Sequence, residues 1–136
     1  MRNASEKARL VEGSGPAVLV VEEDAFLGAM LEDVLRVEGY NATLIVPTLD
    51  ALNDTRRPDV VIVAMPSAGF PGTDLLAACR ERWPIAKTIA IVPAAFGVGP
   101  DTLVAECIRG GATYVIGKPF QCQDILRKVA SLVPWN

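Results

Sequence analysis

Apolar residues recur along this chain in two alternating patterns, and the first is a set of short continuous runs. Each run is rich in valine, isoleucine or alanine and lies close to proline, glycine or charged residues. Such runs are typical of strands that are covered on both faces of a parallel sheet. We therefore expect five strands, at residues 17–21, 42–46, 58–64, 87–92 and 113–117.

Between these runs the apolar residues return at helical spacing. Phe26, Met30 and Val34 follow the first run at intervals that place them on one helical face. Asp24 is the expected N-cap of this helix, and Gly39 is the expected stop. Further helices are expected from a Thr48 cap through about residue 53, at 74–83 after a Thr73 cap, at 101–109 and at 123–132.

Five successive strand–helix units predict an α/β fold with an open, doubly wound parallel sheet. We expect the flavodoxin-like strand order 2-1-3-4-5, with helices on both faces. The polar stretch 1–16 is expected to be a flexible tail, and residues 17–136 to form one domain. In such a sheet the functional residues follow the carboxyl ends of the central strands.

Composition narrows the chemistry that this edge can carry. The chain has no histidine, so it can form no His-dependent catalytic triad, no His-ligated zinc site and no phosphohistidine. A net charge of −3 with scattered basic residues argues against a nucleic-acid partner. Three cysteines without a CxxC pair indicate buried thiols in a reducing cytoplasm. No apolar run is long enough for membrane insertion.

Three segments carry a resemblance to a known family. VLVVEEDAF, PDVVIVAMPSAGFPGTDLL and GATYVIGKPF occur in this order along the chain. Together they resemble the bacterial response-regulator receiver family, over roughly residues 16–133. The resemblance implies two-component signal transduction by phosphorelay. In that family an aspartate accepts a phosphoryl group beside Mg²⁺, which an acid pair holds, while a lysine neutralises a phosphoryl oxygen.

The charged part of the family's site is matched in this chain. Glu22 and Glu23 fall on the acid pair, and Lys118 falls on the lysine. The bond between Lys118 and Pro119 matches a peptide bond that is cis in the family. We expect Lys118 to pair with one glutamate while the other is solvated. The alternative is a residual, weak Mg²⁺ site, but no metal or other cofactor is expected.

Three other positions depart from the family's pattern. Ala64 falls on the acceptor aspartate, and a methyl group can neither be phosphorylated nor bind a metal. Pro93 falls on the hydroxyl position, and Val115 falls on the aromatic switch position, with Tyr114 on the opposite face of the strand. An engineered acceptor-to-alanine change is one explanation of Ala64. The further departures at Pro93 and Val115 favour a naturally degenerate receiver, a pseudo-receiver.

These observations predict a non-enzymatic signalling module that acts by protein–protein interaction without phosphorylation. The resemblance implies a histidine kinase, a phosphotransfer protein or another signalling protein as partner, docking near the helix that Asp24 caps. It also implies a possible homodimer through the face formed by residues 101–109, 113–117 and 123–132. The alternatives are a sensor of a small anion or ion in the vacated acceptor pocket, and a conventional phosphoreceiver with an engineered Ala64.

Overall fold

The computed structural model describes residues 15–93 and 102–134, which are built around one five-stranded sheet. All pairings are parallel in the order β2-β1-β3-β4-β5, so the predicted flavodoxin-like topology is confirmed. The observed strand ends lie within two residues of the expected ones. The strands are β1 (Ala17–Val21), β2 (Asn41–Ile45), β3 (Val60–Ala64), β4 (Lys87–Pro93) and β5 (Tyr114–Lys118).

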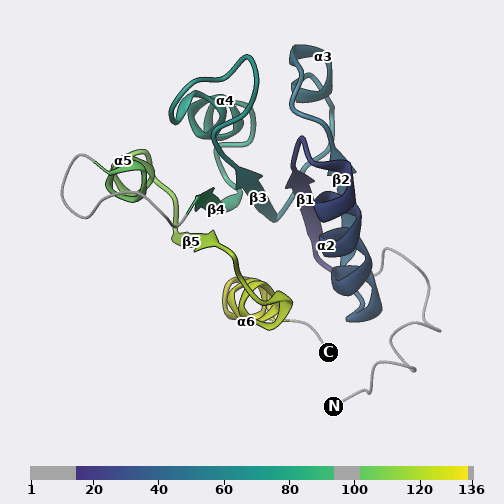
Figure 1. Ribbon diagram of the computed structural model, residues 1–136. Coiled ribbons are helices and arrows are strands. Elements are labelled where there is room, and N and C mark those ends of the chain that lie inside the picture. Colours follow the sequence, from purple (N-terminus) through teal and green to yellow (C-terminus); the bar gives the residue numbers. More distant parts are fainter. Residues whose placement is uncertain (1–14, 94–101, 135–136) are drawn as a thin grey trace.

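Helices cover both faces of this sheet (Figure 1). Of the helices within residues 15–93 and 102–134, two lie on one face and three on the other, as the membership of the two apolar clusters shows. On the first face are α2 (Ala25–Val37) and α6 (Cys122–Leu132). On the second are α3 (Leu49–Leu52), α4 (Asp74–Arg82) and α5 (Leu103–Arg109).

The apolar runs are buried on both sides, as their composition predicts. Val18 and Val20 of β1 point into the cluster beneath α2 and α6, whereas Leu19 and Val21 point into the cluster beneath the other three helices. All four side chains are at most 1% exposed. Because successive strand residues face opposite sides, each central strand contributes to both cores.

Local signals in the sequence explain where α2 begins and ends. The Asp24 carboxylate accepts hydrogen bonds from the amides of Phe26 and Leu27 at 3.0 and 3.1 Å, which confirms it as the N-cap. Gly39 follows the helix with φ of 94°, a conformation that glycine adopts at little cost. Thr73, by contrast, directly precedes α4, but its side chain makes no capping hydrogen bond. The prediction that Thr73 caps this helix through its hydroxyl is therefore wrong.

Two other helices begin directly after a threonine whose hydroxyl accepts a hydrogen bond from a helix amide. The Thr48 hydroxyl accepts from the Ala51 amide at 3.1 Å, as expected for the short helix α3. The Thr102 hydroxyl accepts from the Ala105 amide at 3.2 Å and begins α5, two residues later than predicted. Asp101, the expected start, lies outside the described residues.

The cysteines behave largely as the composition suggests. Cys79 and Cys107 are buried in the core, and burial raises the pKa of their thiols to about 12 and about 11, with Glu106 adding to the second shift. These thiols are therefore apolar packing groups. Cys122, at the start of α6, is only partly buried. Among the described helices, none has the length and apolar character that a membrane span requires.

Candidate functional site

The residues singled out by the sequence meet at the carboxyl edge of the sheet. Glu22 and Glu23 directly follow β1, while Ala64, Pro93 and Lys118 are the last residues of β3, β4 and β5. Pro93 is opposite Lys118 in the β4–β5 register, and Val21 is opposite Val63 in the β1–β3 register. Glu22 and Ala64 therefore continue from neighbouring strands at the same level of the sheet.

Glu22 is the buried acid of the pair, with only 2% of its surface exposed. Its Oε1 accepts a hydrogen bond from the Asp24 amide at 2.9 Å, which ties it to the start of α2. Its Oε2 lies 3.5 Å from Nζ of Lys118 but accepts no hydrogen bond. The contact is therefore a charge interaction without good hydrogen-bond geometry. The expected closed ion pair between Lys118 and one glutamate is present.

Glu23 has a different role from the one expected. Its side chain is exposed, but Oε2 accepts hydrogen bonds from the Ser67 hydroxyl at 3.2 Å and the Ala68 amide at 3.1 Å. The second acid is therefore not simply solvated: it fixes the loop that follows β3. Ser67 lies in the loop after β3, and its 7% exposure shows that it is built into the site. No sequence signal distinguished this serine from any other loop hydroxyl.

Apolar side chains fill the altered positions. Ala64 is 6% exposed and belongs to the core beneath α2 and α6. Val115 packs against the opposite core, whereas Tyr114 packs on the side of Ala64, so the predicted face change is confirmed. The Tyr114 hydroxyl lies 3.0 Å from the Ser131 hydroxyl, which holds the ring against α6. Pro93 is exposed at the end of β4.

Two peptide bonds at this edge are cis. The bond between Lys118 and Pro119 was expected to be cis from the resemblance, and the structure shows it so. The bond between Met65 and Pro66, in the loop that Glu23 holds, is also cis and was not anticipated.

The side chains at this edge do not fit a Mg²⁺ site of the receiver type. The position of the third carboxylate holds Ala64, Glu22 faces an ammonium group, and the Glu23 oxygen already accepts two hydrogen bonds. Mg²⁺ demands hard oxygen ligands in a nearly ideal octahedron. In the part of the chain that the structure describes, no group of three or more acidic, Cys or His side chains could hold a metal.

A parallel sheet of order β2-β1-β3-β4-β5, with an acid pair and a lysine at its carboxyl edge, defines the class of receiver-like α/β domains. No family model matches the chain. It is 30% identical over 111 residues to the chemotaxis protein CheY of Thermotoga maritima, with 79% of this chain and 88% of that protein covered. The chain belongs to the response-regulator receiver family.

Two further similarities agree with this assignment. The chain is 33% identical over 123 residues to the DNA-binding response regulator MtrA of Mycobacterium tuberculosis, covering 88% of this chain and 51% of MtrA. It therefore spans about half the length of MtrA and of the other curated transcriptional regulators that it matches, while it covers most of the shorter CheY. The Vibrio cholerae chemotaxis protein CheY4 has the same fold, with a TM-score of 0.74 at 20% identity over 88% of this chain and 100% of that one.

Proposed function

We propose that this chain is a cytoplasmic, non-enzymatic receiver that signals without being phosphorylated, through contacts with other proteins. One observation carries the proposal. The position of the phosphoacceptor holds the buried methyl group of Ala64, while the lysine that would neutralise a phosphoryl group faces Glu22 at 3.5 Å. With no nucleophilic oxygen at this position and with the lysine paired, the edge is suited to one fixed conformation.

The start of α2 provides a surface for a protein partner. Phe26 is 84% exposed, and Met30, one helical turn later, is 37% exposed. Next to them lies a cavity of about 430 Å³, which Leu27, Met30, Lys118, Pro119 and Phe120 line. Exposed apolar side chains beside a cavity mark interaction sites in soluble proteins. We assign this surface to a histidine kinase, a phosphotransfer protein or another signalling protein.

The face of α5, β5 and α6 is the proposed site of a homodimer. Val104 and Ile108, one turn apart on α5, are 42% and 60% exposed. Lys128 of α6 adds positive charge to this face, with its ammonium 4.9 Å from the ring centre of Tyr114, and Arg127 forms an ion pair with Asp124 beside it. An apolar stripe with a charged border is the composition that protein interfaces prefer.

The alternative sensor function receives less support from the same geometry. An anion in the acceptor pocket would have to draw Lys118 away from Glu22, and the buried Oε2 of Glu22 would then have no counter-charge. An engineered acceptor change would not explain Pro93 at the end of β4 or Val115 in the core. Both observations favour a receiver that is inactive towards phosphate by nature.

An NMR titration tests the proposal directly. Amide shifts are recorded as Mg²⁺ and then beryllofluoride, a mimic of the phosphoryl group, are added to the protein, with an acceptor-containing receiver as positive control. We expect the amides of Glu23, Ala64 and Lys118 to stay in place, because the acceptor carboxylate is absent. Intact mass after incubation with acetyl phosphate should likewise be unchanged. Saturable shifts at these amides, or a mass gain of one phosphoryl group, would contradict the proposal.

A further inference from the structure

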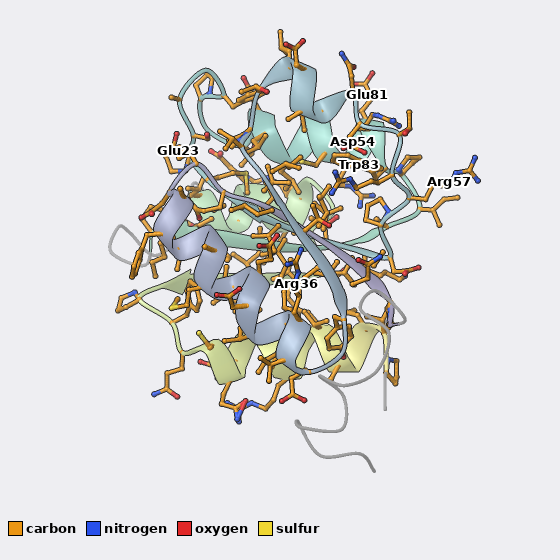
Figure 2. The ribbon with its side chains drawn as sticks, turned by 90° about the vertical axis from the view of Figure 1, so that its right-hand side faces the viewer. Glu23, Arg36, Asp54, Arg57, Glu81 and Trp83 are labelled. Carbon is orange, nitrogen blue, oxygen red and sulfur yellow. The ribbon has the colours of Figure 1, made fainter. Side chains whose placement is uncertain are left out.

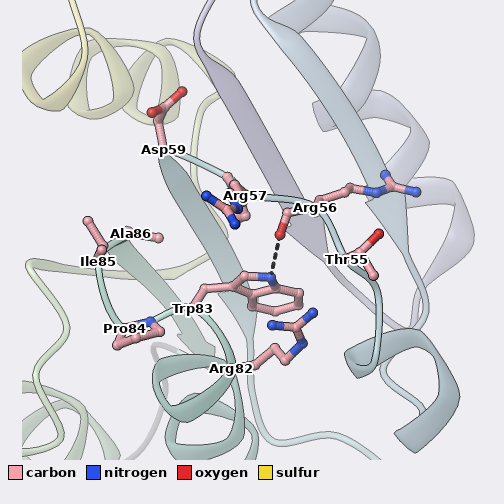
Figure 3. Close-up of a pocket in the computed structure, with 10 residues that line it drawn as sticks. Thr55, Arg56, Arg57, Asp59, Arg82, Trp83, Pro84, Ile85 and Ala86 are labelled. Carbon is pink, nitrogen blue, oxygen red and sulfur yellow. Dashed lines mark hydrogen bonds between the residues drawn. The ribbon is translucent and has the colours of Figure 1, made fainter.

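A second concave site lies at the opposite, amino edge of the sheet. An open cavity of about 560 Å³ is lined by residues 55–59, which lead into β3, and residues 82–86, which lead into β4 (Figure 3). This volume is within the ~300–1,000 Å³ that small-molecule pockets occupy. Figure 2 shows Arg57 of this cavity and Glu23 of the carboxyl edge on opposite sides of the molecule.

The wall of the cavity is held in place before any ligand arrives. The buried indole of Trp83 donates from Nε1 to the Arg56 carbonyl at 3.0 Å (Figure 3). The Arg82 guanidinium lies 5.7 Å from the centre of the Trp83 ring and donates to the Asp54 carbonyl. Two hydrogen bonds thus join the segment before β3 to the end of α4, and the contact between Arg82 and Trp83 packs that end together. A preorganised wall lowers the entropic cost of binding.

Asp54 binds Arg56, one of the arginines that line the cavity. Its carboxylate accepts from the Arg56 amide at 2.8 Å and from Arg56 Nε at 3.0 Å. The hydrogen bond from the Arg56 amide is the main cause that keeps the pKa of Asp54 below its usual value, and the bond from Arg56 Nε adds to it. The carboxylate of Asp59, the acid that lines the cavity, is also occupied, because it accepts from the Ala17 amide at 2.8 Å.

Arg57 is the lining cation with unused hydrogen-bonding capacity. It is exposed, and no other residue that the structure describes forms an ion pair or a hydrogen bond with its side chain. Three arginines and one aspartate line the cavity. Because Arg56 is paired with Asp54, the excess of positive charge comes from Arg57 and Arg82 against Asp59, in a chain whose net charge is −3. A planar guanidinium with free N–H groups is the residue that best matches a carboxylate or phosphate.

We propose that this cavity binds a small organic anion through a carboxylate or phosphate group held by Arg57. Arg82 adds positive charge at the wall, while Pro58, Pro84 and Ile85 provide apolar contact for the remainder of the ligand. Ile85 is 93% exposed, so its side chain is accessible to a ligand in the cavity. This site is independent of the proposed function at the carboxyl edge.

Fluorescence of Trp83 provides the test. The chain has two tryptophans, and Trp135→Phe leaves Trp83 as the sole tryptophan, which is excited selectively at wavelengths that tyrosine does not absorb. This protein is titrated with pyrophosphate and, separately, with citrate. We expect a saturable change in emission with at least one of them, because the wall that binds the anion contains the indole. Saturation by pyrophosphate alone would assign a phosphate ligand, and saturation by citrate alone would assign a carboxylate.

Variants locate the response. Arg57→Gln should weaken binding by about tenfold or more, since a charge-assisted contact is lost. Arg127→Gln, at an exposed arginine of α6, is the matched control and should leave binding unchanged. Lys118→Gln should also leave it unchanged, which separates this cavity from the carboxyl edge. In the unaltered protein, amide shifts should concentrate at residues 55–59 and 82–86. Absence of saturation, or saturation that survives Arg57→Gln, would overturn the proposal.

Discussion

The two halves of the carboxyl edge differ in how their side chains are satisfied. In the half that retains the family's residues, Glu22 and Lys118 neutralise each other, and Glu23 binds the loop at Ser67. In the half that departs from the family, Ala64 is enclosed in an apolar core. The retained charges therefore have partners within the chain, and none of Ala64, Pro93 and Val115 offers a replacement for the missing carboxylate.

This difference shows that the acid pair and the lysine make contacts within the chain that do not require phosphorylation chemistry. A buried carboxylate such as Glu22 is costly unless a cation is near, and Lys118 is that cation. Glu23 supports a backbone amide and a hydroxyl that a shorter or apolar side chain would leave without their acceptor. Glu22 and Glu23 therefore each have a structural role that does not require a metal.

The largest expected effect comes from restoring the acceptor. Ala64→Asp places a carboxylate in a position that is 6% exposed, at the level of Glu22. We expect the free energy of unfolding to fall by about 2–4 kcal/mol, because a second buried acid would share a single lysine. Mg²⁺ should restore part of this loss, since the new carboxylate would complete a set of three with the two glutamates.

Urea denaturation with and without Mg²⁺ measures both effects. Ala77→Asp, at an exposed position of α4, is the matched control and should change the stability by less than about 0.5 kcal/mol. If Ala64→Asp were as stable as the control without Mg²⁺, the apolar character assigned to the altered half would be wrong.

A smaller loss is expected when the retained ion pair is broken. Lys118→Met leaves the Glu22 carboxylate buried without a counter-charge, which should cost about 1–3 kcal/mol. The lower part of this range is expected because 36% of the Lys118 side chain is exposed to solvent. The double variant with Glu22→Gln should recover part of the loss in a double-mutant cycle.

Lys87→Met, at an exposed lysine that begins β4, serves as the control for the loss of a surface charge. Equal losses for Lys118→Met and Lys87→Met would mean that the ion pair contributes nothing measurable, and Glu22 would then need another explanation for its burial.

Residue patterns predicted the strand order and the positions at the carboxyl edge because both depend on signals that are local in the sequence. The apolar runs identify the strands that are buried on both faces, and the motif around Lys118 identifies a residue that lies at the carboxyl edge of the sheet. The bond between Glu23 and Ser67 joins residues 44 positions apart, and it depends on how the loop after β3 folds back. The missing cap at Thr73 likewise depends on a hydroxyl orientation that residue type does not determine.

A moderate effect is expected at the contact that the sequence did not reveal. Glu23→Ala removes the acceptor for the Ser67 hydroxyl and the Ala68 amide, which should cost about 0.5–1.5 kcal/mol. Hydrogen exchange at the Ala68 amide should become faster, because that amide loses its partner. Ser67→Ala is the matched comparison, since it removes only one of the two bonds. Unchanged exchange at Ala68 in Glu23→Ala would show that Glu23 does not hold the loop.

The smallest expected effect is at the second altered position. Pro93→Thr restores a hydroxyl group at the end of β4, where the side chain is exposed, so the stability should change by less than about 0.5 kcal/mol. Beryllofluoride should still produce no amide shifts, because the side chain of Ala64 has no oxygen to which it could bind. The new hydroxyl on β4 would then have no bound group to contact. Adding Ala64→Asp to the same chain should create a response where Pro93→Thr alone does not. If Pro93→Thr alone responded to beryllofluoride, the acceptor position would not be the element that limits phosphate recognition at this edge.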